Sequence, residues 1–552
     1  MVIGSARKVV WIAGRRLAMC FGIAATVLVT SCGGGGGGGG APTAGSPSAS
    51  GPAAPASLAL STANGNVLLQ WSDVVEATQY RVYSSGTPSI DPTGMSYVEV
   101  TDPSYQISGA PDNAALYCVV TSVGADGEGL PSIEQSIMVA PSSPLKYYPT
   151  WYDATPTRNL EFIYNGAKTS AQNGADLKTE IVNLVAGDRL TVGGGTYTIN
   201  SLFDISLSGT AANPIWIEAK TGEIPIITRS NASQNTVNMG QGGPCSFVCI
   251  RGFEITGGSI ALRMHDCDNV WIDKCHIHDC QDNAIAANSQ PVNNLTFTEN
   301  HIHGTGGTGE GFYIGGNFAS PIANSCVIAM NHVHDTAGTQ GDGIEVKQGS
   351  WGNWIAENIV HDTPYPSILV YGTGGMPFNI VERNLCWNSG DNVIQAQGEA
   401  IIRNNLMMNG KYGFFSNDHQ GTVTDLVVVH NTIINDQFGA RMDDWGGKPG
   451  MIFANNVVYS QLQASVLFND GSNGVTVAGN VVLGTVGGVS SGFIFGNGLS
   501  DFVSASFDGT LRDVTPSLMS AVLGEGSAPL VVVDDLNGDI RTTRVDAGAV
   551  DG

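Results

Sequence analysis

The chain has 552 residues, of which 48 are acidic and 24 are basic, so its formal charge at neutral pH is −24. Nucleic-acid phosphates require a basic face, so this balance excludes nucleic acid as the expected partner. Charged residues are only 13% of the chain and glycine occurs 73 times, which favours short strands and tight turns. Because no long stretch has the apolar period of an amphipathic helix, we expect an all-β protein.

Residues 1–31 are typical of a signal peptide. Basic residues up to Arg16 precede an apolar run, 17–30, that is short for a membrane span. The run ends at Ser31–Cys32, which resembles a bacterial lipobox; the resemblance implies cleavage before Cys32 and lipidation of its thiol. An ordinary secretory signal is the alternative. Cleavage would remove four basic residues and no acid, which changes the charge from −24 to −28.

Residues 32–55 are rich in Gly, Ala, Pro and Ser and have no apolar period, which predicts a flexible tether. We therefore expect a protein of the bacterial cell envelope that contacts the membrane through a lipid anchor at Cys32. We also expect it to be a monomer.

Residues 56–141 contain short alternating strands separated by turn residues, which is typical of a β-sandwich. An early Trp71, the strand Gln79–Tyr83 and a late strand around Tyr117 together resemble a fibronectin type III module. Such a module implies a spacer or a binding scaffold. Pro141–Pro144 then marks a domain boundary.

The remainder of the chain is repetitive. An Asn followed two positions later by an apolar residue recurs at intervals of 21 to 31 residues, which indicates a solenoid. The skeleton of leucine-rich repeats and the longer period of propeller blades are both absent. The repeated residues are Asn300, Asn331, Asn358, Asn384, Asn405, Asn431, Asn456 and Asn480.

A parallel β-helix explains this Asn. Each coil needs a residue at its corner that tolerates the left-handed conformation, and Asn accepts it. Stacked Asn side chains can bond one another, and the apolar residue two positions later points into the core. The pattern resembles the right-handed parallel β-helix repeat (pectin-lyase-like) proteins, so we expect this fold over 145–552, with coils from about Leu177. Segments 187–197 and 208–215 resemble the opening coils of secreted β-helix polysaccharide lyases, and 535–549 resembles their closing segment.

Strand alternation predicts which side chains face outward before each Asn turn. With Phe312, Ile344, Ile368, Phe414 and Ala440 inward, the outward side chains form one polar strip. Residues 392–398 are ambiguous, because either Gln395 and Gln397 or Ile394 and Ala396 could face outward. The other members of the strip are Tyr313, Glu345, Lys347, Leu369, Tyr371, Phe415, Asn417, His419, Arg441 and Asp443.

Such a strip suits sugar recognition and also β-elimination of a uronate. That reaction needs a base of near-neutral pKa and a group that neutralises the sugar carboxylate. A Lys whose pKa is depressed by neighbouring cations can be the base, and Ca²⁺ held by acids can neutralise the carboxylate. A bound cation would also reconcile an acidic protein with a polyanionic substrate.

Segment 342–347, Asp-Gly-Ile-Glu-Val-Lys, resembles the coil of the chondroitinase-B and alginate lyase family in which a metal-ligating acid precedes the catalytic Lys. The resemblance implies Lys347 as base and Asp342 and Glu345 as Ca²⁺ ligands, with Glu310 as a possible third. That family has an Arg on the following coil, where this chain has Tyr371, which could act as general acid. Tyr313, Asn417, Arg441 and Asp443 are the expected substrate-binding residues.

Three alternatives stay open. Lys347 and Glu345 can simply pair on an exposed strand, where such a bridge contributes little. Glu345 with Asp443 or Asp444 can supply the two carboxylates of a glycoside hydrolase. The protein can also be a non-catalytic glycan-binding or adhesion protein of the cell surface.

All ten histidines lie in the repeats. His278, His303, His334 and His361 recur at one position, and His276, His301 and His332 at another. Such density can bind Zn²⁺, but identical side chains stack in many solenoids, and Trp387 and Met408 replace His farther along, so we favour structural stacking. His419 lies outside both rows, beside the strip, and is the alternative proton carrier. The eight cysteines after Cys32 can form disulfides or stack as buried thiols.

Overall fold

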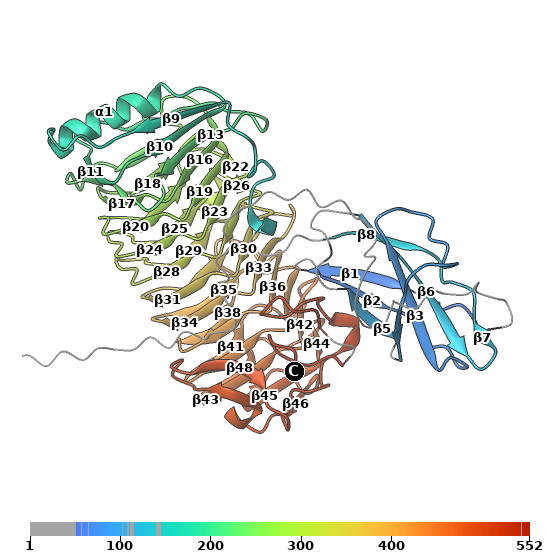
Figure 1. Cartoon of the computed structure of the whole chain (residues 1–552). Helices are drawn as coiled ribbons and strands as arrows, with labels where there is room; N and C mark the ends of the chain where they lie inside the picture. Colours follow the sequence, from blue (N-terminus) through green and yellow to red (C-terminus); the bar gives the residue numbers. More distant parts are fainter. Residues whose placement is uncertain are drawn as a thin grey trace, which may run out of the picture.

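The computed structural model describes residues 51–56, 58–63, 66–101, 103–107, 110, 115–139, 145–541 and 544–552. The expected signal peptide, Cys32 and most of the tether lie outside these residues. Figure 1 shows a long stack of coils and a smaller β-sandwich beside the C-terminal half of the stack. In the part of the chain that is described, no helix is long and apolar enough to cross a membrane.

Most coils contribute one strand to each of three parallel ladders of strands, here called the first, second and third sheets. Strands pair in parallel with the coil before and the coil after, as expected for a right-handed parallel β-helix. The first sheet contains β9 (Arg158–Phe162), β10 (Asp188–Val192), β13 (Ile215–Ala219), β16 (Cys245–Arg251), β19 (Cys267–Asp273), β22 (Val292–Asn293), β23 (Thr296–Thr298), β26 (Ala323–Asn324), β27 (Val327–Ala329), β30 (Trp354–Ala356), β33 (Asn379–Glu382), β36 (Ala400–Arg403), β39 (Leu426–Val429), β42 (Ile452–Ala454) and β44 (Thr476–Ala478).

The second and third sheets form the other two faces. The second contains β11 (Gly195–Thr198), β14 (Pro225–Arg229), β17 (Glu254–Gly257), β20 (His276–His278), β24 (His301–His303), β28 (His332–His334), β31 (Ile359–Thr363), β34 (Leu385–Ser389), β37 (Leu406–Met408), β40 (Thr432–Asn435), β43 (Val457–Phe468), β45 (Asn480–Gly487) and β46 (Phe493–Phe495). The third contains β12 (Asp204–Ile205), β15 (Val237–Met239), β18 (Leu262–Met264), β21 (Ile285–Ala287), β25 (Phe312–Ile314), β29 (Ile344–Val346), β32 (Ile368–Val370), β35 (Asn392–Ala396), β38 (Tyr412–Ser416), β41 (Phe438–Met442) and the end of β43.

The core is a column of apolar side chains inside the coils. The residue two positions after each repeated Asn is buried, as predicted, and pairs in register with its counterpart on the next coil, for example Ile302 with Val333. Burial of one such side chain stabilises the fold by about 1.5–3 kcal/mol. The repeat therefore encodes the core directly.

The repeated Asn forms the predicted ladder, but the left-handed residue is not the Asn itself. Asn384 Nδ2 donates to Asn405 Oδ1 at 3.0 Å, and Asn405 Nδ2 donates to Asn431 Oδ1 at 3.0 Å. The positive φ belongs to the preceding residue, as at Arg383 (54°) and Asn404 (55°). The corner therefore turns one residue early, which lets the Asn point inward and bond the next coil.

One helix, α1 (Ser170–Val182), departs from the all-β expectation. Thr169 and Gln172 form a capping box at its N-terminus, and Leu177 and Ile181 are buried against the coils. Figure 1 shows α1 over the N-terminal end of the stack, beside β11. It covers apolar residues that would otherwise face solvent where the coils begin.

The sandwich, within the predicted 56–141, has two antiparallel sheets. Trp71 packs on Tyr80 in its core, with ring centroids 5.3 Å apart. Leu68 contacts Ile540, so the sandwich touches the C-terminal segment of the chain. Its strands are β1 (Ala59–Ala63), β2 (Asn66–Gln70) and β5 (Ser104–Ile107), and β3 (Gln79–Ser85), β4 (Val98–Val100), β6 (Ala115–Gly124), β7 (Gly127–Glu128) and β8 (Gln135–Met138).

Coils do not extend over all of 145–552. Residues 145–157, which we call the strap, lie on the outer face of the first sheet, where Tyr147 packs on Trp354 and Trp151 on Trp216. Residues 499–552, the C-terminal segment, contain the hairpin of β47 (Phe502–Ala505) and β48 (Arg512–Pro516). This segment packs on outward apolar side chains of the second sheet, including Met408 and Tyr459.

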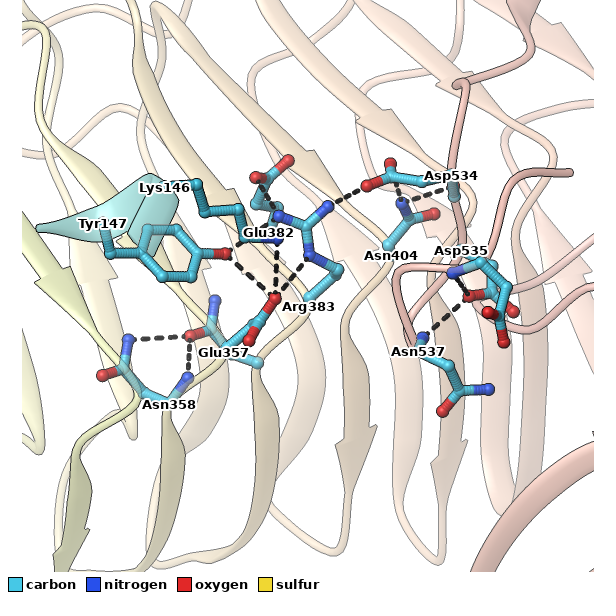
Figure 2. Close-up of polar contacts among 12 residues, drawn as sticks. Lys146, Tyr147, Glu357, Asn358, Glu382, Arg383, Asn404, Asp534, Asp535 and Asn537 are labelled. Atoms are coloured by element: carbon cyan, nitrogen blue, oxygen red, sulfur yellow. Dashed lines mark hydrogen bonds and ion pairs between the residues drawn. The ribbon is translucent and has the colours of Figure 1, made fainter. Parts of the chain in front are cut away.

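Strap and C-terminal segment meet at Arg383, which is buried (Figure 2). Arg383 donates to Glu382 Oε1 at 2.7 Å and to the Tyr147 hydroxyl at 2.9 Å, and it pairs with Asp534. Lys146 pairs with Glu357 in the same cluster at 2.9 Å. One ionic cluster thus joins three parts of the chain.

The eight cysteines in the described residues are buried free thiols, so stacked thiols are found rather than disulfides. Cys245 and Cys267, for example, pair in register on neighbouring coils of the first sheet.

Candidate functional site

The predicted polar strip lies on the outer face of the third sheet and lines a groove of about 530 Å³. The register places Tyr313, Glu345, Leu369, Gln395, Phe415 and Arg441 in one column, one residue per coil. The pairing of Ile394 with Phe414 settles the ambiguous coil, because Ile394 then faces the core and Gln395 faces the groove. Lys347, Tyr371, Asn417, His419, Arg441 and Asp443 all line the same groove.

Lys347 lies at one end of the groove and is almost fully buried, with 4% of its surface exposed. Its Nζ donates to Glu345 Oε1 and lies 4.6 Å from the ring centroid of Tyr313 and 5.6 Å from that of Tyr371. The pair is therefore not the exposed bridge considered above. A buried amine held between two aromatic faces is a group in a fixed position.

Glu345, Asp342 and Glu310 form a buried carboxylate cluster around this lysine. One oxygen from each residue lies within 4.8 Å of one from each of the others. Lys347 donates a hydrogen bond to Glu345 Oε1, and Asn283 donates one to Glu310 Oε2. The other buried oxygens, Glu345 Oε2, Glu310 Oε1 and Asp342 Oδ1, have no hydrogen-bond partner. Buried oxygens without a donor are costly, and a hard cation would satisfy all three.

Burial and mutual repulsion shift the pKa values of this cluster. Burial raises the pKa of Glu310 to about 7, and it raises that of Asp342 well above its usual range, with Glu345 and Glu310 adding to the effect. The pKa of Glu345 is also raised by burial. Three carboxyl groups face one ammonium group, so all three can be ionised together only at a cost, which a divalent cation would offset.

Lys347 differs from the sequence-based expectation. A base with a depressed pKa was expected, but Glu345 raises the pKa of Lys347 even though burial opposes it. The physical reason is that the anions beside the ammonium outweigh its loss of hydration. With the carboxylates uncompensated, Lys347 is therefore a cation rather than a base.

Tyr371 and His419 lie next to the lysine. Tyr371 is 3% exposed, and burial raises its pKa well above 10, so its hydroxyl keeps its proton at neutral pH. The exposed ring of His419 stacks on Tyr371 with a centroid distance of 5.7 Å. Tyr371 thus holds a proton close to Lys347, and His419 covers it from the solvent side.

The far end of the groove carries Arg441 and Asp443. Arg441 Nε donates to Asp443 Oδ1 at 3.0 Å, and Arg441 Nη1 donates to the Tyr412 hydroxyl at 3.0 Å. Arg441 lies four coils from Glu345, which is ~19 Å at the usual strand spacing. The groove is long enough for an oligosaccharide rather than a single sugar.

This separation argues against a glycoside hydrolase built on Glu345 and Asp443. The carboxylates of such enzymes are about 5–10 Å apart, whereas these residues are separated by four coils. Asp443 is also paired with Arg441, and Asp444 has a left-handed backbone (φ 64°) in the turn beyond the strand. The pair cannot flank one glycosidic bond.

Two expected site residues do not line the groove. Tyr313 is packed behind Lys347 against Ile260 and Ala286, and Glu310 is fully buried below the floor. Sequence reasoning missed Asn392, Lys411 and Tyr412, which do line it. Val393 and Ile394 are both buried, so the inward–outward alternation of side chains is interrupted at this corner. The alternation therefore could not predict that Asn392, the residue before Val393, faces the groove.

The histidine rows lie on the second sheet, outside the groove. His276, His301 and His332 pair in register, as do His278, His303, His334 and His361, so the predicted stacking is confirmed. Ring centroids of successive members are 4.8–5.1 Å apart. None of these residues belongs to the site on the third sheet.

Comparison with known proteins agrees with this architecture. The family model for right-handed β-helix regions matches residues 215–385 and 322–482. None of the curated proteins compared with the sequence matches it. Together with the parallel sheets and the repeats above, this makes the chain a right-handed parallel β-helix protein.

Solved structures with a similar arrangement include the pectate lyase Pel9A, at 14% identity and a TM-score of 0.43, covering 72% of this chain and 97% of that one. An alginate lyase from Paenibacillus sp. str. FPU-7 is 18% identical with a TM-score of 0.37, covering 61% and 99%. A fibronectin type III-like protein from Clostridium thermocellum is 25% identical over 16% of this chain and 95% of its own, with a TM-score of 0.14.

Proposed function

We propose that this protein is a polysaccharide lyase that cleaves a uronate-containing polysaccharide by β-elimination in the groove of the third sheet. The observation that carries the proposal is the position of Lys347, buried at the groove floor beside three carboxylates with unpartnered oxygens. The reaction requires a base, a proton donor and a group that neutralises the sugar carboxylate; the amine of Lys347, the phenol of Tyr371 and a cation at the carboxylate cluster would fill these roles. All three lie together at one end of a groove of oligosaccharide length.

The residues fit a calcium site. Glu310, Asp342 and Glu345 would hold the ion through the buried oxygens that have no donor, and oxygen is the ligand that Ca²⁺ prefers. Bound there, Ca²⁺ would neutralise the substrate carboxylate and offset the charge of Glu345. The acidic residues of the groove would then be compatible with a polyanionic substrate.

In the proposed reaction, the neutral amine of Lys347 removes the proton from the sugar carbon next to the carboxylate. The electron pair of that C–H bond forms a carbon–carbon double bond, and the bond from the neighbouring carbon to the glycosidic oxygen breaks. The Tyr371 hydroxyl gives its proton to the leaving oxygen. The products are a new chain end and an unsaturated uronate.

Arg441 and Asn417 would bind the chain beyond the cleaved bond, together with Lys411, which sequence reasoning missed. Arg441 is held by Asp443 and Tyr412, so its guanidinium is oriented before substrate arrives. A planar fork of donors in a fixed position suits a sugar carboxylate. Asp443 thus positions Arg441 in this proposal.

The test is to incubate the full chain with polygalacturonate, alginate and glycosaminoglycans while following the ultraviolet absorbance of unsaturated uronate. Absorbance should rise on one of them with Ca²⁺ and should fall to background with a chelator or in Lys347→Ala. No rise on any polyuronate, with or without Ca²⁺, would overturn the proposal. Binding of a polysaccharide without product would then favour the non-catalytic glycan-binding protein.

We further propose that Cys32 anchors the mature protein to the cell envelope, since the lipobox-like junction and the tether precede the folded part of the chain. Mass spectrometry of the N-terminal peptide should find a diacylglycerol on Cys32 and no residue before it. An unmodified Cys32 thiol, or cleavage elsewhere, would show an ordinary secreted protein.

A further inference from the structure

Seven imidazoles form a double column on the outer face of the second sheet, away from the groove. They come from four successive coils, on β20, β24, β28 and β31, and all are partly exposed. We call this the histidine column. Its members are His276, His278, His301, His303, His332, His334 and His361.

The two halves of the histidine column meet through ring nitrogens. Three diagonal pairs have Nε2 atoms 2.7–2.9 Å apart, as in His301 with His334 at 2.7 Å and His332 with His361 at 2.9 Å. In each pair one ring donates Nε2–H to the Nε2 of the other, so an ion that displaces this proton would find two nitrogen ligands side by side. The Nε2 atoms therefore form a row of potential ligands between the two halves.

Carboxylates on the flank of the column fix the tautomer of three rings. The Nδ1 atoms of His278, His334 and His361 lie 2.9, 2.7 and 2.7 Å from Oδ2 of the following Asp279, Asp335 and Asp362. A neutral imidazole that donates Nδ1–H to a carboxylate has its lone pair on Nε2. This arrangement of carboxylate and imidazole is the one that orients histidines that bind metal ions.

An unpartnered ligand atom points to the same conclusion. His278 Nε2 is buried and accepts no hydrogen bond, and it lies 3.4 Å from Glu254 Oε1. Two groups of side chains that share no residue each have three ligand atoms within 4.8 Å of one another. One group is Glu254, His276 and His278, and the other is His301, His332 and His334.

We propose that the histidine column binds divalent transition-metal ions such as Zn²⁺, at two sites formed by these two groups. Imidazole nitrogen favours Zn²⁺, Ni²⁺ and Cu²⁺, in contrast to the oxygen ligands of the carboxylate cluster on the third sheet. Each site includes one imidazole backed by an Asp. A third group, His276, His301 and His303, overlaps both and has Gly304 where the others have Asp.

The continuation of the column supports a specific role for the histidines. On the next coils the same position holds Trp387, Met408 and Ile434, and the C-terminal segment covers these side chains. The second sheet thus has apolar side chains at this position where the C-terminal segment covers it, and imidazoles where its outer face is open to ions in solution. This proposal does not depend on the proposed function of the groove.

The test is calorimetric titration of the full chain, stripped with a chelator and dialysed, with ZnCl₂ in the presence of excess CaCl₂. Excess Ca²⁺ competes for sites made of oxygen ligands alone, and the variants below assign the remaining zinc signal to the histidine column whether or not Ca²⁺ binds the carboxylate cluster. We expect two ions per chain with Kd of about 1 µM or lower. Absence of saturable binding, or Kd weaker than about 100 µM, would overturn the proposal.

Variants locate the ions. His334→Phe keeps an aromatic ring in the stack, as Trp387 does two coils farther on, and should remove one ion; His278→Phe should remove the other. The matched control is His265→Asn, because His265 bonds Ser289 and lies outside the column. Unchanged stoichiometry in both Phe variants would overturn the assignment. Circular dichroism without metal checks that each variant is folded.

X-ray absorption at the zinc edge gives a readout that does not depend on stoichiometry. A nitrogen-dominated first shell with imidazole scattering supports the proposal, and a shell of oxygen alone contradicts it.

Discussion

The state of Lys347 depends on the charges within a few ångströms of its ammonium group. Burial of 96% of the surface of Lys347 lowers its pKa, but Glu345 Oε1 accepts a hydrogen bond from Lys347 Nζ, and the charges of Glu345 and Asp342 together raise the pKa by more. A residue in this position becomes a base only when the carboxylates are compensated. Base strength and cation binding are therefore coupled at the scale of one side chain.

We predict that Tyr371 and His419 differ in their effect on β-elimination. Tyr371 keeps its proton, and its ring centroid lies 5.6 Å from Lys347 Nζ. The ring of His419 stacks on Tyr371 at the exposed rim of the groove. Tyr371→Phe should lower kcat by roughly 10²–10⁴-fold with little change in KM, and His419→Asn by less than about 10-fold. Steady-state kinetics on the best substrate checks this. The reverse order would make His419 the proton donor.

A second prediction concerns pH and His430. This buried residue accepts a hydrogen bond from Asn455, and burial, with Arg541 adding to it, holds its pKa well below 6.5. The unfolded chain binds this proton near pH 6.5 but the folded chain does not, so stability is lost as pH falls below about 6.5. His430 therefore contributes a decrease in the urea midpoint between pH 7.5 and pH 5, opposite in sign to the contribution of the carboxyls whose pKa is raised, such as Glu310.

The variant His430→Asn should reduce this pH dependence. The neighbouring coils have Asn404 and Asn455 at the same position, with the same left-handed backbone, so Asn fits there. The midpoint should then fall less between pH 7.5 and pH 5 than in the wild type. An equal slope in both proteins would place the acid sensitivity elsewhere.

At the scale of one element, the Asn ladder shows how a single repeated residue defines a coil. Asn405 Oδ1 accepts from the backbone N–H and from the side chain of Asn384, and its own Nδ2 donates to Val381 and to Asn431. All the partners are buried, so none of them can form a hydrogen bond with water in place of Asn405. The ladder therefore holds neighbouring coils in register.

We predict that Asn405→Ala lowers the free energy of unfolding by about 3 kcal/mol or more. The loss arises because the substitution leaves several buried polar groups without partners, at about 1–3 kcal/mol each. The matched control is Asn473→Ala, since Asn473 is exposed and outside the ladder; it should cost less than about 0.5 kcal/mol. Urea titration followed by circular dichroism measures both. Equal effects would show that the ladder contributes little.

The repeats and the strip were predictable because both depend on short-range periodicity. Spacing of Asn300 and Asn331 defines successive coils, and alternation around Phe312 or Ile344 defines the outward residues. Local pattern cannot show that Lys347 is buried, because the tyrosines that pack on it, Tyr313 and Tyr371, lie on the coils before and after. It therefore cannot show either that burial lowers the pKa of Lys347 while the neighbouring Glu345 raises it by more. Local pattern also cannot show that the residue with the left-handed backbone is Arg383 rather than the repeated Asn384.

For the whole molecule, segments outside the coils decide which faces are accessible. The strap covers outward aromatic residues of the first sheet, and the C-terminal segment covers the apolar part of the second. The third sheet keeps its groove, and the uncovered part of the second keeps its histidine column. Coils were expected from about Leu177 to the C-terminus, so the strap lies before the expected coils and only the C-terminal segment departs from them; repeat spacing fades gradually at the ends of a solenoid.

Arg383 connects these covering segments, and we predict that Arg383→Met releases them before the coils unfold. The change leaves Glu357, Glu382 and Asp534 facing one another in a buried site, at a cost of about 3–5 kcal/mol. The matched control is Arg403→Met, because Arg403 pairs with Glu382 as well but is 28% exposed, so solvent screens its loss.

Limited proteolysis with peptide mapping measures the release. Early cuts within 145–157 and 499–552 should appear in Arg383→Met and be rare in Arg403→Met and in the wild type. Release should also expose Met408 and Tyr459, so binding of a hydrophobic dye should rise in the same variant alone. If first cuts fall within the coils instead, the cluster stabilises the β-helix itself, and the strap and C-terminal segment are held by their aromatic and apolar contacts.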